Sequence, residues 1–215
     1  MAKKPLKSAG KPEPRPYHLG DLKEKLIAAT EALIMERGVD GFSLREVARR
    51  AGVSPAAPSH HFGDASGLLA EVAYLGFRDF ADALAAADAR GKDPASRLYE
   101  QGLAYVGFAL RYPARFTLMF RQRAFGGDHA GLVTESARAF SILENAIRAA
   151  TGTAREAQLS QGGFGLLLAT WSIVHGFAHL ALEGQLDHAA KEMKMGVLDR
   201  ILPLTLQHLP AAKVQ

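Results

Sequence analysis

Apolar residues recur at every third or fourth position along most of this chain of 215 residues. That spacing gives an α-helix one apolar face, whereas a half-buried strand would alternate apolar and polar residues. We find no alternating stretch and no internal repeat. The pattern therefore predicts an all-α fold, with helices at residues 22–37, 44–51, 55–62, 65–89, 94–111, 114–120, 128–150, 155–183 and 187–208.

Helix-boundary signals are densest around the second and third predicted helices. Ser43 followed by Glu46 is a capping box, which predicts a helix starting at the next residue. Gly52 follows that helix, where a left-handed residue ends many helices. Ser54 and Pro55 then predict a new helix at once, as N-cap and first helical residue. Two helices joined by a short glycine turn form a helix-turn-helix, although a hairpin within a larger bundle is the alternative.

The remaining boundary residues are simpler. Asp21 and Asp64 are expected to cap the first and fourth helices, and Gly38 and Gly184 to follow the first and eighth. A loop is expected at Gly126-Gly127. The fourth helix starts beside the helix-turn-helix and continues into the next segment, so it should join the two halves of the chain.

Four blocks of sequence read Ser43-Leu44-Arg45-Glu46-Val47-Ala48, Ala51-Gly52-Val53-Ser54, His61-Phe62 and Asp64…Leu68-Leu69. With the helix before them, these blocks resemble the TetR family of bacterial transcriptional regulators, from Tyr17 to roughly Phe80. Ser59 and Ala65 depart from the pattern, where the family usually has Tyr and Lys. The opening Tyr17-His18-Leu19-Gly20-Asp21-Leu22 and the later Trp171-Ser172-Ile173-Val174-His175-Gly176 resemble a subgroup with a W-x-x-x-H-G C-terminal domain.

The resemblance implies a domain organisation that charge supports. Residues 17–80 would be a helix-turn-helix DNA-binding domain, which a connecting helix joins to a ligand-binding and dimerisation domain at 81–215. Residues 1–16, with five basic residues and four prolines, are expected to form a flexible basic arm. Residues 1–63 hold 11 Lys and Arg against 7 Asp and Glu, and the remainder holds 15 of each sign. The positive excess therefore falls on the segment expected to bind phosphates.

The predicted recognition helix carries no Arg, Lys, Asn or Gln for bidentate base contacts. We therefore expect Arg45 to read a base, and phosphate contacts to make binding strongly salt-sensitive. Pro58 cannot donate a helical hydrogen bond, so the helix should begin irregularly. The expected DNA-binding residues are Lys23, Arg45, Ser54, Pro55, Ala56, Ser59, His60 and His61, together with the basic arm.

The resemblance also implies an effector site and a dimer. Aromatic residues with a few polar groups suit a pocket for a mostly apolar ligand, although the same residues could form a packed core. The expected pocket residues are Phe108, Phe116, Phe120, Phe140, Trp171, His175 and His179. The last two helices carry more apolar surface than one subunit can cover, and the expected dimer residues are Leu167, Val174, Leu182, Met193, Val197 and Ile201. The implied function is a cytoplasmic, homodimeric repressor that a small effector releases from a palindromic operator.

Other classes of function have weaker support. Residues 162–182 carry no charged side chain, but their glycines and polar residues favour a buried helix over a membrane span. His175 and His179 have the spacing of two zinc ligands, but Gly176 stands where the zincin motif requires Glu, and only a distant residue such as His129 could add a third ligand. A metal-dependent all-α enzyme and a protein-binding helical scaffold remain alternatives. We predict no catalytic residue, metal or cofactor.

Overall fold

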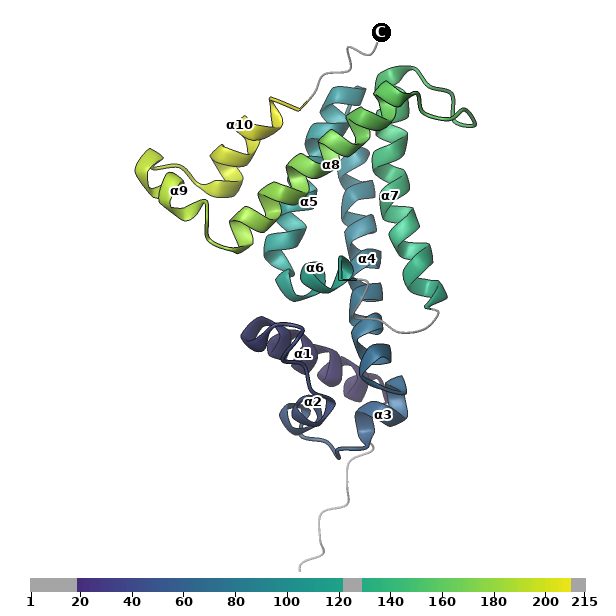
Figure 1. Cartoon of the computed structure of the whole chain (residues 1–215), viewed down its shortest axis with the longest axis vertical. Helices are drawn as coiled ribbons and strands as arrows, with labels where there is room; N and C mark the ends of the chain where they lie inside the picture. The colour runs from purple at the N-terminus through teal and green to yellow at the C-terminus, as the bar shows by residue number, and fades with distance from the viewer. Residues whose placement is uncertain (1–18, 122–128, 210–215) are drawn as a thin grey trace, which may run out of the picture.

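The computed structural model describes residues 19–121 and 129–209. Every regular element in these ranges is helical, which confirms the all-α prediction (Figure 1). The elements are α1 (Leu19–Arg37), α2 (Leu44–Ala51), α3 (Ala57–Phe62), α4 (Ala65–Asp88), α5 (Pro94–Arg111), α6 (Pro113–Met119), α7 (Ala130–Thr151), α8 (Gln161–Leu182), α9 (Asp187–Met193), the π-helix η2 (Val197–Ile201) and α10 (Leu202–Leu206).

The first three helices form a small bundle at one end of the molecule (Figure 1). Leu26 and Leu33 of α1 and Val47 of α2 are fully buried in its core. Gly38 and Gly52 end α1 and α2 with φ angles of 71° and 68°, a left-handed conformation that glycine adopts without steric cost. The sequence signals for these two helix ends are therefore confirmed.

Helix α4 connects the two ends of the molecule, as predicted. Asp64 caps it by accepting a hydrogen bond from the backbone of Gly67 at 2.8 Å. Leu68 of α4 belongs to the core shared with α1 and α2, whereas Phe80 of α4 belongs to the core shared with α5 and α8. One continuous helix therefore contributes to both cores, so a displacement of α4 would change the packing of both.

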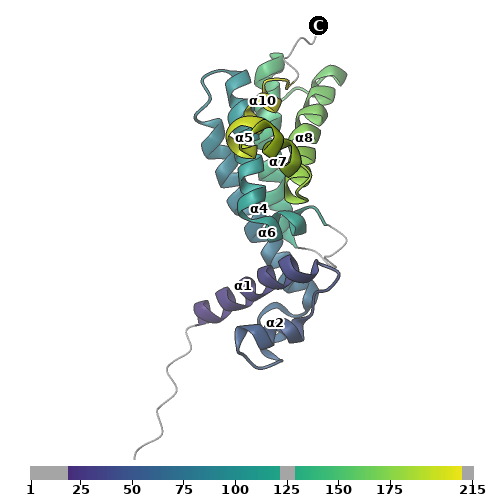
Figure 2. The ribbon, with the colours of Figure 1, turned by 90° about the vertical axis from the view of Figure 1, so that its left-hand side faces the viewer.

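Helices α5 and α7 pack beside the second half of α4, α8 packs on α5 and α7, and α10 lies against α5 (Figures 1 and 2). The core between them is rich in aromatic side chains, with Phe80, Tyr105, Phe108, Phe116 and Phe177 all buried. Gly102 of α5 makes room for Leu206 of α10, because a Cβ there would lie 2.7 Å from Leu206 Cδ2.

Two predicted starts in the N-terminal half are wrong. Helix α1 begins at Leu19, so Asp21 lies in its first turn and pairs with Lys25 at 2.8 Å instead of capping the helix. Helix α3 begins at Ala57 and not at Pro55, after a turn in which the Ala57 amide donates to the carbonyl of Ser54 at 3.0 Å. This turn confirms the irregular helix start that we predicted from the proline at position 58. Pro58 itself is buried in the first turn of α3, where its missing N–H is not needed.

The predicted start of α8 at residue 155 is also wrong. The helix begins at Gln161, and Ser160 caps it by accepting a hydrogen bond from the Gly163 amide at 3.1 Å. Helix α7 begins at Ala130 and ends before Gly152, whose φ is 65°. The expected loop at Gly126-Gly127 lies outside the described residues.

The single helix predicted at residues 187–208 is broken into three pieces. Lys194 ends α9 in a left-handed conformation, with φ 51°. Ile201 then donates to the carbonyl of Gly196 at 3.1 Å, five residues back, which makes the turn before α10 a π-helix. Pro203 follows, and its ring would clash with the carbonyl four residues earlier in a regular helix. The wider turn accommodates that proline.

The surface of α8 differs from the prediction. Leu167 and Val174, expected at a dimer interface, are 1% and 5% exposed inside the subunit. Phe164, Leu168 and Leu180 lie on the opposite side, with 53%, 41% and 46% exposure. Because α8 is apolar all round, its sequence did not indicate which face the subunit covers. By length and composition α8 could cross a membrane, which for one such helix is weak evidence.

Candidate DNA-binding surface and apolar cavity

The predicted DNA-binding residues gather around α2 and α3, at the end of the molecule away from α9 (Figure 1). The turn before α3 and the helix itself place five of them at the surface, and His61 is half-buried. The exposed residues are Ser54, Pro55, Ala56, Ser59 and His60.

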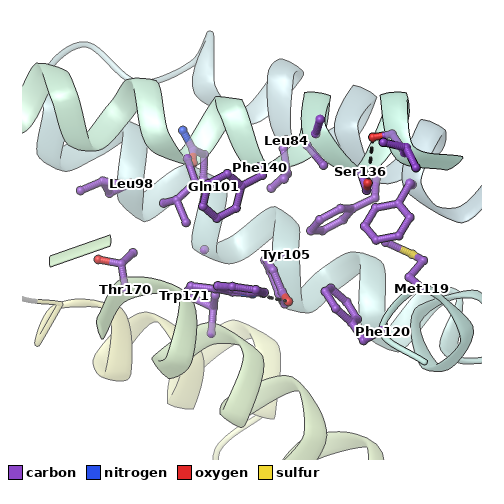
Figure 3. A pocket seen from close by; sticks show the side chains of 18 residues that line it. Leu84, Leu98, Gln101, Tyr105, Met119, Phe120, Ser136, Phe140, Thr170 and Trp171 are labelled. Atoms are coloured by element: carbon purple, nitrogen blue, oxygen red, sulfur yellow. Dashed lines mark hydrogen bonds between the residues drawn. The ribbon is translucent and has the colours of Figure 1, made fainter. Parts of the chain in front are cut away.

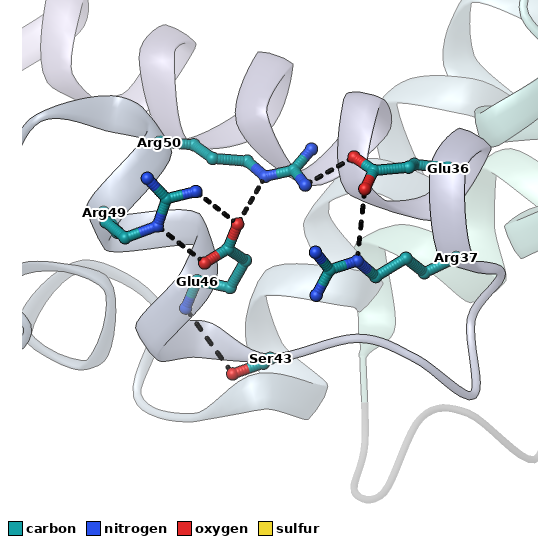
Figure 4. A network of polar contacts seen from close by, with 6 residues as sticks. All are labelled: Glu36, Arg37, Ser43, Glu46, Arg49 and Arg50. Atoms are coloured by element: carbon teal, nitrogen blue, oxygen red, sulfur yellow. Dashed lines mark hydrogen bonds and ion pairs between the residues drawn. The ribbon is translucent and has the colours of Figure 1, made fainter.

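The three arginines of α2 differ in their partners. Figure 4 shows Glu46 between Arg49 and Arg50. Arg49 donates to both oxygens of Glu46, at 2.7 and 2.8 Å, and Arg50 donates at 2.9 Å. These hydrogen bonds, chiefly that from Arg49, lower the pKa of Glu46 to about 2. Arg45 is exposed and forms no ion pair with any residue that the structure describes, so its guanidinium is available for DNA.

This network also corrects the predicted capping box. Ser43 accepts a hydrogen bond from the Glu46 amide at 3.5 Å, which is the first half of the motif. The second half is replaced, because the Glu46 carboxylate binds Arg49 and Arg50 and not the Ser43 amide. Lys23 is occupied in a similar way, since its Nζ lies 2.7 Å from Glu71 Oε1 on α4. A phosphate contact from Lys23 requires that pair to open.

A cavity of about 380 Å³ lies between α4, α5, α7 and α8 (Figure 3). Its lining is mostly aliphatic and aromatic. Three predicted pocket residues, Phe120, Phe140 and Trp171, line this cavity. The size lies within the range of small-molecule sites.

The other four predicted pocket residues lie outside this lining. Phe116 is fully buried, and its ring contacts those of His175 and His179 at centroid distances of 5.7 and 5.6 Å. Phe108 packs on Phe80 at 5.1 Å. Phe116, His175 and His179 therefore form an aromatic layer beside the cavity, in which His179 is exposed.

Tyr105 joins the cavity to that aromatic layer. The Trp171 indole can only donate, so Tyr105 Oη accepts from its Nε1 at 3.3 Å, and the same oxygen shares a hydrogen bond of 2.7 Å with His175 Nδ1. Burial, with a smaller contribution from His179, lowers the pKa of His175. Burial also raises the pKa of Tyr105, so the phenol stays protonated.

The sequence interpretation missed several lining residues, among them Tyr105, Gln101 and Thr170. A signal for Gln101 was present, since Leu98, Gln101 and Tyr105 recur at helical spacing and Gln is the polar member of that stripe. Thr170 gave no comparable signal, because its helix is apolar on every side.

Helix α6 connects the cavity to the N-terminal bundle. Met119 and Phe120, at its end, line the cavity. Arg115, one turn earlier, donates from Nε to Glu31 Oε1 of α1 at 2.6 Å and from Nη1 to Asp79 Oδ2 of α4 at 2.7 Å. The same short helix therefore contacts both the candidate ligand site and the helix that supports the candidate DNA surface.

Two family models match the chain, one in the N-terminal half and one in the C-terminal half. Residues 26–72 match the bacterial regulatory proteins of the tetR family, and residues 98–202 match the tetracyclin repressor-like C-terminal domain. The chain belongs to the TetR family. It is a DNA-binding transcriptional regulator by family, and the W-x-x-x-H-G subgroup stays a prediction.

Solved structures agree with this TetR assignment. A protein of unknown function from Rhodococcus sp. RHA1 is 30% identical, with a TM-score of 0.69 over 91% of this chain and 99% of that one. A TetR family regulator from Marinobacter aquaeolei VT8 shares the fold at 18% identity and a TM-score of 0.65, over 87% and 93% of the two chains. The TetR family regulator PfmR from Thermus thermophilus shares the fold at 21% identity and a TM-score of 0.56, over 70% of this chain and 85% of that one. No protein with a curated function matches the chain.

The TetR assignment does not favour the metal-enzyme alternative. The imidazoles of His175 and His179 lie 4.6 Å apart between centroids, and their neighbours are aromatic rings. Within residues 19–121 and 129–209, no group of three or more His, Asp or Glu side chains is arranged to hold a metal ion. His175 instead shares a hydrogen bond with Tyr105, which is a structural role.

Proposed function

We propose that this TetR protein is a homodimeric repressor, acting in the cytoplasm, which a small, mostly apolar effector releases from a palindromic operator. The observation that carries the proposal is the position of α6. Its Met119 lines the cavity and its Arg115 binds Glu31 of α1, so a molecule in the cavity contacts the element that holds the N-terminal bundle.

The proposed DNA-binding domain spans residues 17–80 and the proposed effector and dimerisation domain spans 81–215. The two cores support a boundary within α4, because Val72 packs with the N-terminal bundle and Phe77 packs with the C-terminal helices. The proposed DNA contacts are those of α2, α3 and Lys23, with Arg45 as the base-reading residue. The basic arm at 1–16 lies outside the described residues, and its phosphate contacts are a proposal from sequence.

The exposed face of α8 supports the proposed dimer. Phe164, Leu168 and Leu180 are exposed there, and a Cβ added at Gly165 or Gly176 would meet no atom within 4 Å. Apolar and small residues at helical spacing allow two such helices to pack closely across a two-fold axis. A stable dimer of this kind buries upwards of about 1,200 Å² in total.

Release follows from a difference in affinity between two spacings of the DNA-binding domains. Two half-sites on one face of the duplex lie about 34–36 Å apart, so a dimer must hold its two α3 helices at that separation. A ligand that fits the cavity better when α6 is displaced favours another separation. Operator affinity then falls by the same factor by which DNA lowers ligand affinity.

A reporter experiment in bacteria tests the repressor proposal. Duplexes selected from a random pool by the purified protein are placed between a promoter and a reporter gene. We expect co-expression of the protein to lower reporter output, and Arg45→Ala to restore it. Unchanged or increased output with the unaltered protein contradicts a repressor.

A further inference from the structure

Thr170 is a buried hydroxyl without a partner on the cavity wall. Its side chain is 3% exposed, and its Oγ1 forms no hydrogen bond with any residue that the structure describes. Threonines elsewhere in these helices donate to the carbonyl four residues earlier, as Thr30 does to Leu26 at 2.8 Å and Thr205 to Ile201 at 3.0 Å. An unpaired buried hydroxyl costs free energy, so this one is suited to a partner that arrives with a ligand.

Gln101 adds an acceptor to the same cavity. Its Nε2 donates to Asp88 Oδ1 at 2.6 Å, and Arg97 donates to both oxygens of Asp88 at 2.7 and 2.8 Å. The Asp88 contact fixes the orientation of the amide, because an ionised carboxylate can only accept and the amide atom that faces it must therefore be the NH2 nitrogen. Gln101 Oε1 accepts no hydrogen bond from the described part of the chain. Figure 3 shows Gln101 and Thr170 toward one end of the cavity, away from Met119 and Phe120.

The rest of the lining offers little to a charged ligand. No Asp, Glu, Lys, Arg or His belongs to it. The Tyr105 hydroxyl is already bound to His175 and Trp171, and the Ser136 hydroxyl donates to the carbonyl of Val133 at 2.9 Å. A carboxylate or ammonium entering the cavity would lose its hydration without gaining a counter-charge.

We propose that the cavity binds an uncharged, mainly hydrocarbon molecule that carries one hydroxyl group. The hydroxyl oxygen of such a molecule accepts from Thr170 Oγ1, and Gln101 Oε1 offers an acceptor for its proton at the same end of the cavity. The hydrocarbon part fills the apolar space toward Met119 and Phe120. This ligand class refines the proposed effector and rests on that function only for its effect on DNA binding.

Calorimetry on the full-length protein with four carbon-matched probes tests the class: decan-1-ol, decane, decanoic acid and decylamine. We expect the alcohol to bind most tightly. Thr170→Val should weaken binding of the alcohol by roughly threefold to tenfold and leave the affinity for decane unchanged. The melting temperature of the free protein should stay equal or rise. Thr170→Ser should keep the alcohol preference. Thr134→Val, which removes an exposed hydroxyl of α7 outside the cavity lining, is the matched control and should leave alcohol binding unchanged.

Three results overturn the ligand class: the acid or amine binds as tightly as the alcohol, Thr170→Val keeps the alcohol preference, or none of the probes binds. Operator titrations with decan-1-ol separate this inference from the proposed function. Tight alcohol binding without loss of operator affinity supports the ligand class and contradicts effector release. Operator binding by a protein that does not bind the alcohol overturns the ligand class alone.

Discussion

The guanidinium of Arg115 donates to the carboxylate of Glu31, with 2.6 Å between Nε and Oε1. Arg115 belongs to α6 and Glu31 to α1, so this ion pair links the cavity side of the molecule to the helix-turn-helix side. The Arg115 side chain is 17% exposed, and its second bond to Asp79 of α4 holds it in place. We therefore expect this residue to couple ligand binding in the cavity to the affinity for DNA.

Replacing Arg115 should uncouple the two sites. In Arg115→Met, decan-1-ol and the operator should each bind, but the ligand should lower operator affinity by about fivefold less than in the unaltered protein, a loss of roughly 1 kcal/mol of coupling. Fluorescence anisotropy with and without the alcohol measures this difference. Arg90→Met, which breaks the exposed pair with Glu100 far from α6, is the control. Full coupling in Arg115→Met would show that the signal takes another route.

Arg45 and Arg49 should differ in their effect on DNA recognition. Arg45→Ala is expected to cost about 1–3 kcal/mol of operator affinity and to relax preference at one base pair, because its guanidinium is free to read a base. Arg49→Ala removes the same charge from the same helix, but Glu46 binds that guanidinium. Arg49→Ala should therefore leave the preference at every base pair unchanged. Titrations of single-base operator variants compare the two. Equal loss on every duplex for both variants would remove Arg45 from the reading surface.

The lowered pKa of His175 predicts a pH dependence of stability. In the range just below 6.5, its ordinary pKa, the unfolded chain binds a proton that folded His175 does not. The free energy of unfolding contributed by this group is therefore complete above 6.5 and is lost as the pH falls through the lower folded value. Urea unfolding across that range, with NMR titration of the imidazole, measures the effect. His175→Gln should flatten the dependence, and an imidazole that titrates above 6.5 would contradict the assignment.

The exposed face of α8 should govern assembly. Leu168 is 41% exposed, so Leu168→Glu should leave the subunit fold intact while placing two charges against each other across the proposed two-fold axis. Light scattering should then report the 23.1 kDa monomer instead of a dimer. Met35→Glu makes the same change at an exposed position of α1 and should stay dimeric. A dimer in both variants would place the interface elsewhere.

The sequence was most informative where a local signal determines the backbone. Gly38, Gly52 and Asp64 each end or begin a helix through contacts within four residues, and each was located correctly. The predicted starts failed at Pro55 and at residue 155, because several residues there could begin a helix and packing selected one of them. The long apolar pattern of residues 187–208 concealed the break after Lys194, while helical structure continues through Pro203 by way of the π-helical turn.

Long-range contacts could not be read from the sequence. The apolar character of α8 on all sides hid the difference between Leu167, which is buried, and Leu168, which is exposed. The partners of Arg115 lie 36 and 84 positions away in the chain, so no spacing rule connects them. Aromatic composition indicated a ligand site, but the structure separates Phe120 and Trp171, which line the cavity, from Phe116, which packs behind it.

The most direct test of the account is the binding of the purified protein to one selected operator and one scrambled duplex at several salt concentrations. We expect the operator to bind at least about 10³-fold more tightly, because specific regulators exceed their non-specific affinity by that factor or more. Both affinities should fall steeply with salt, because we expect phosphate contacts to outnumber base contacts on a surface where Arg45 is the proposed base-reading residue. Equal affinity for the two duplexes at every salt concentration would contradict the account.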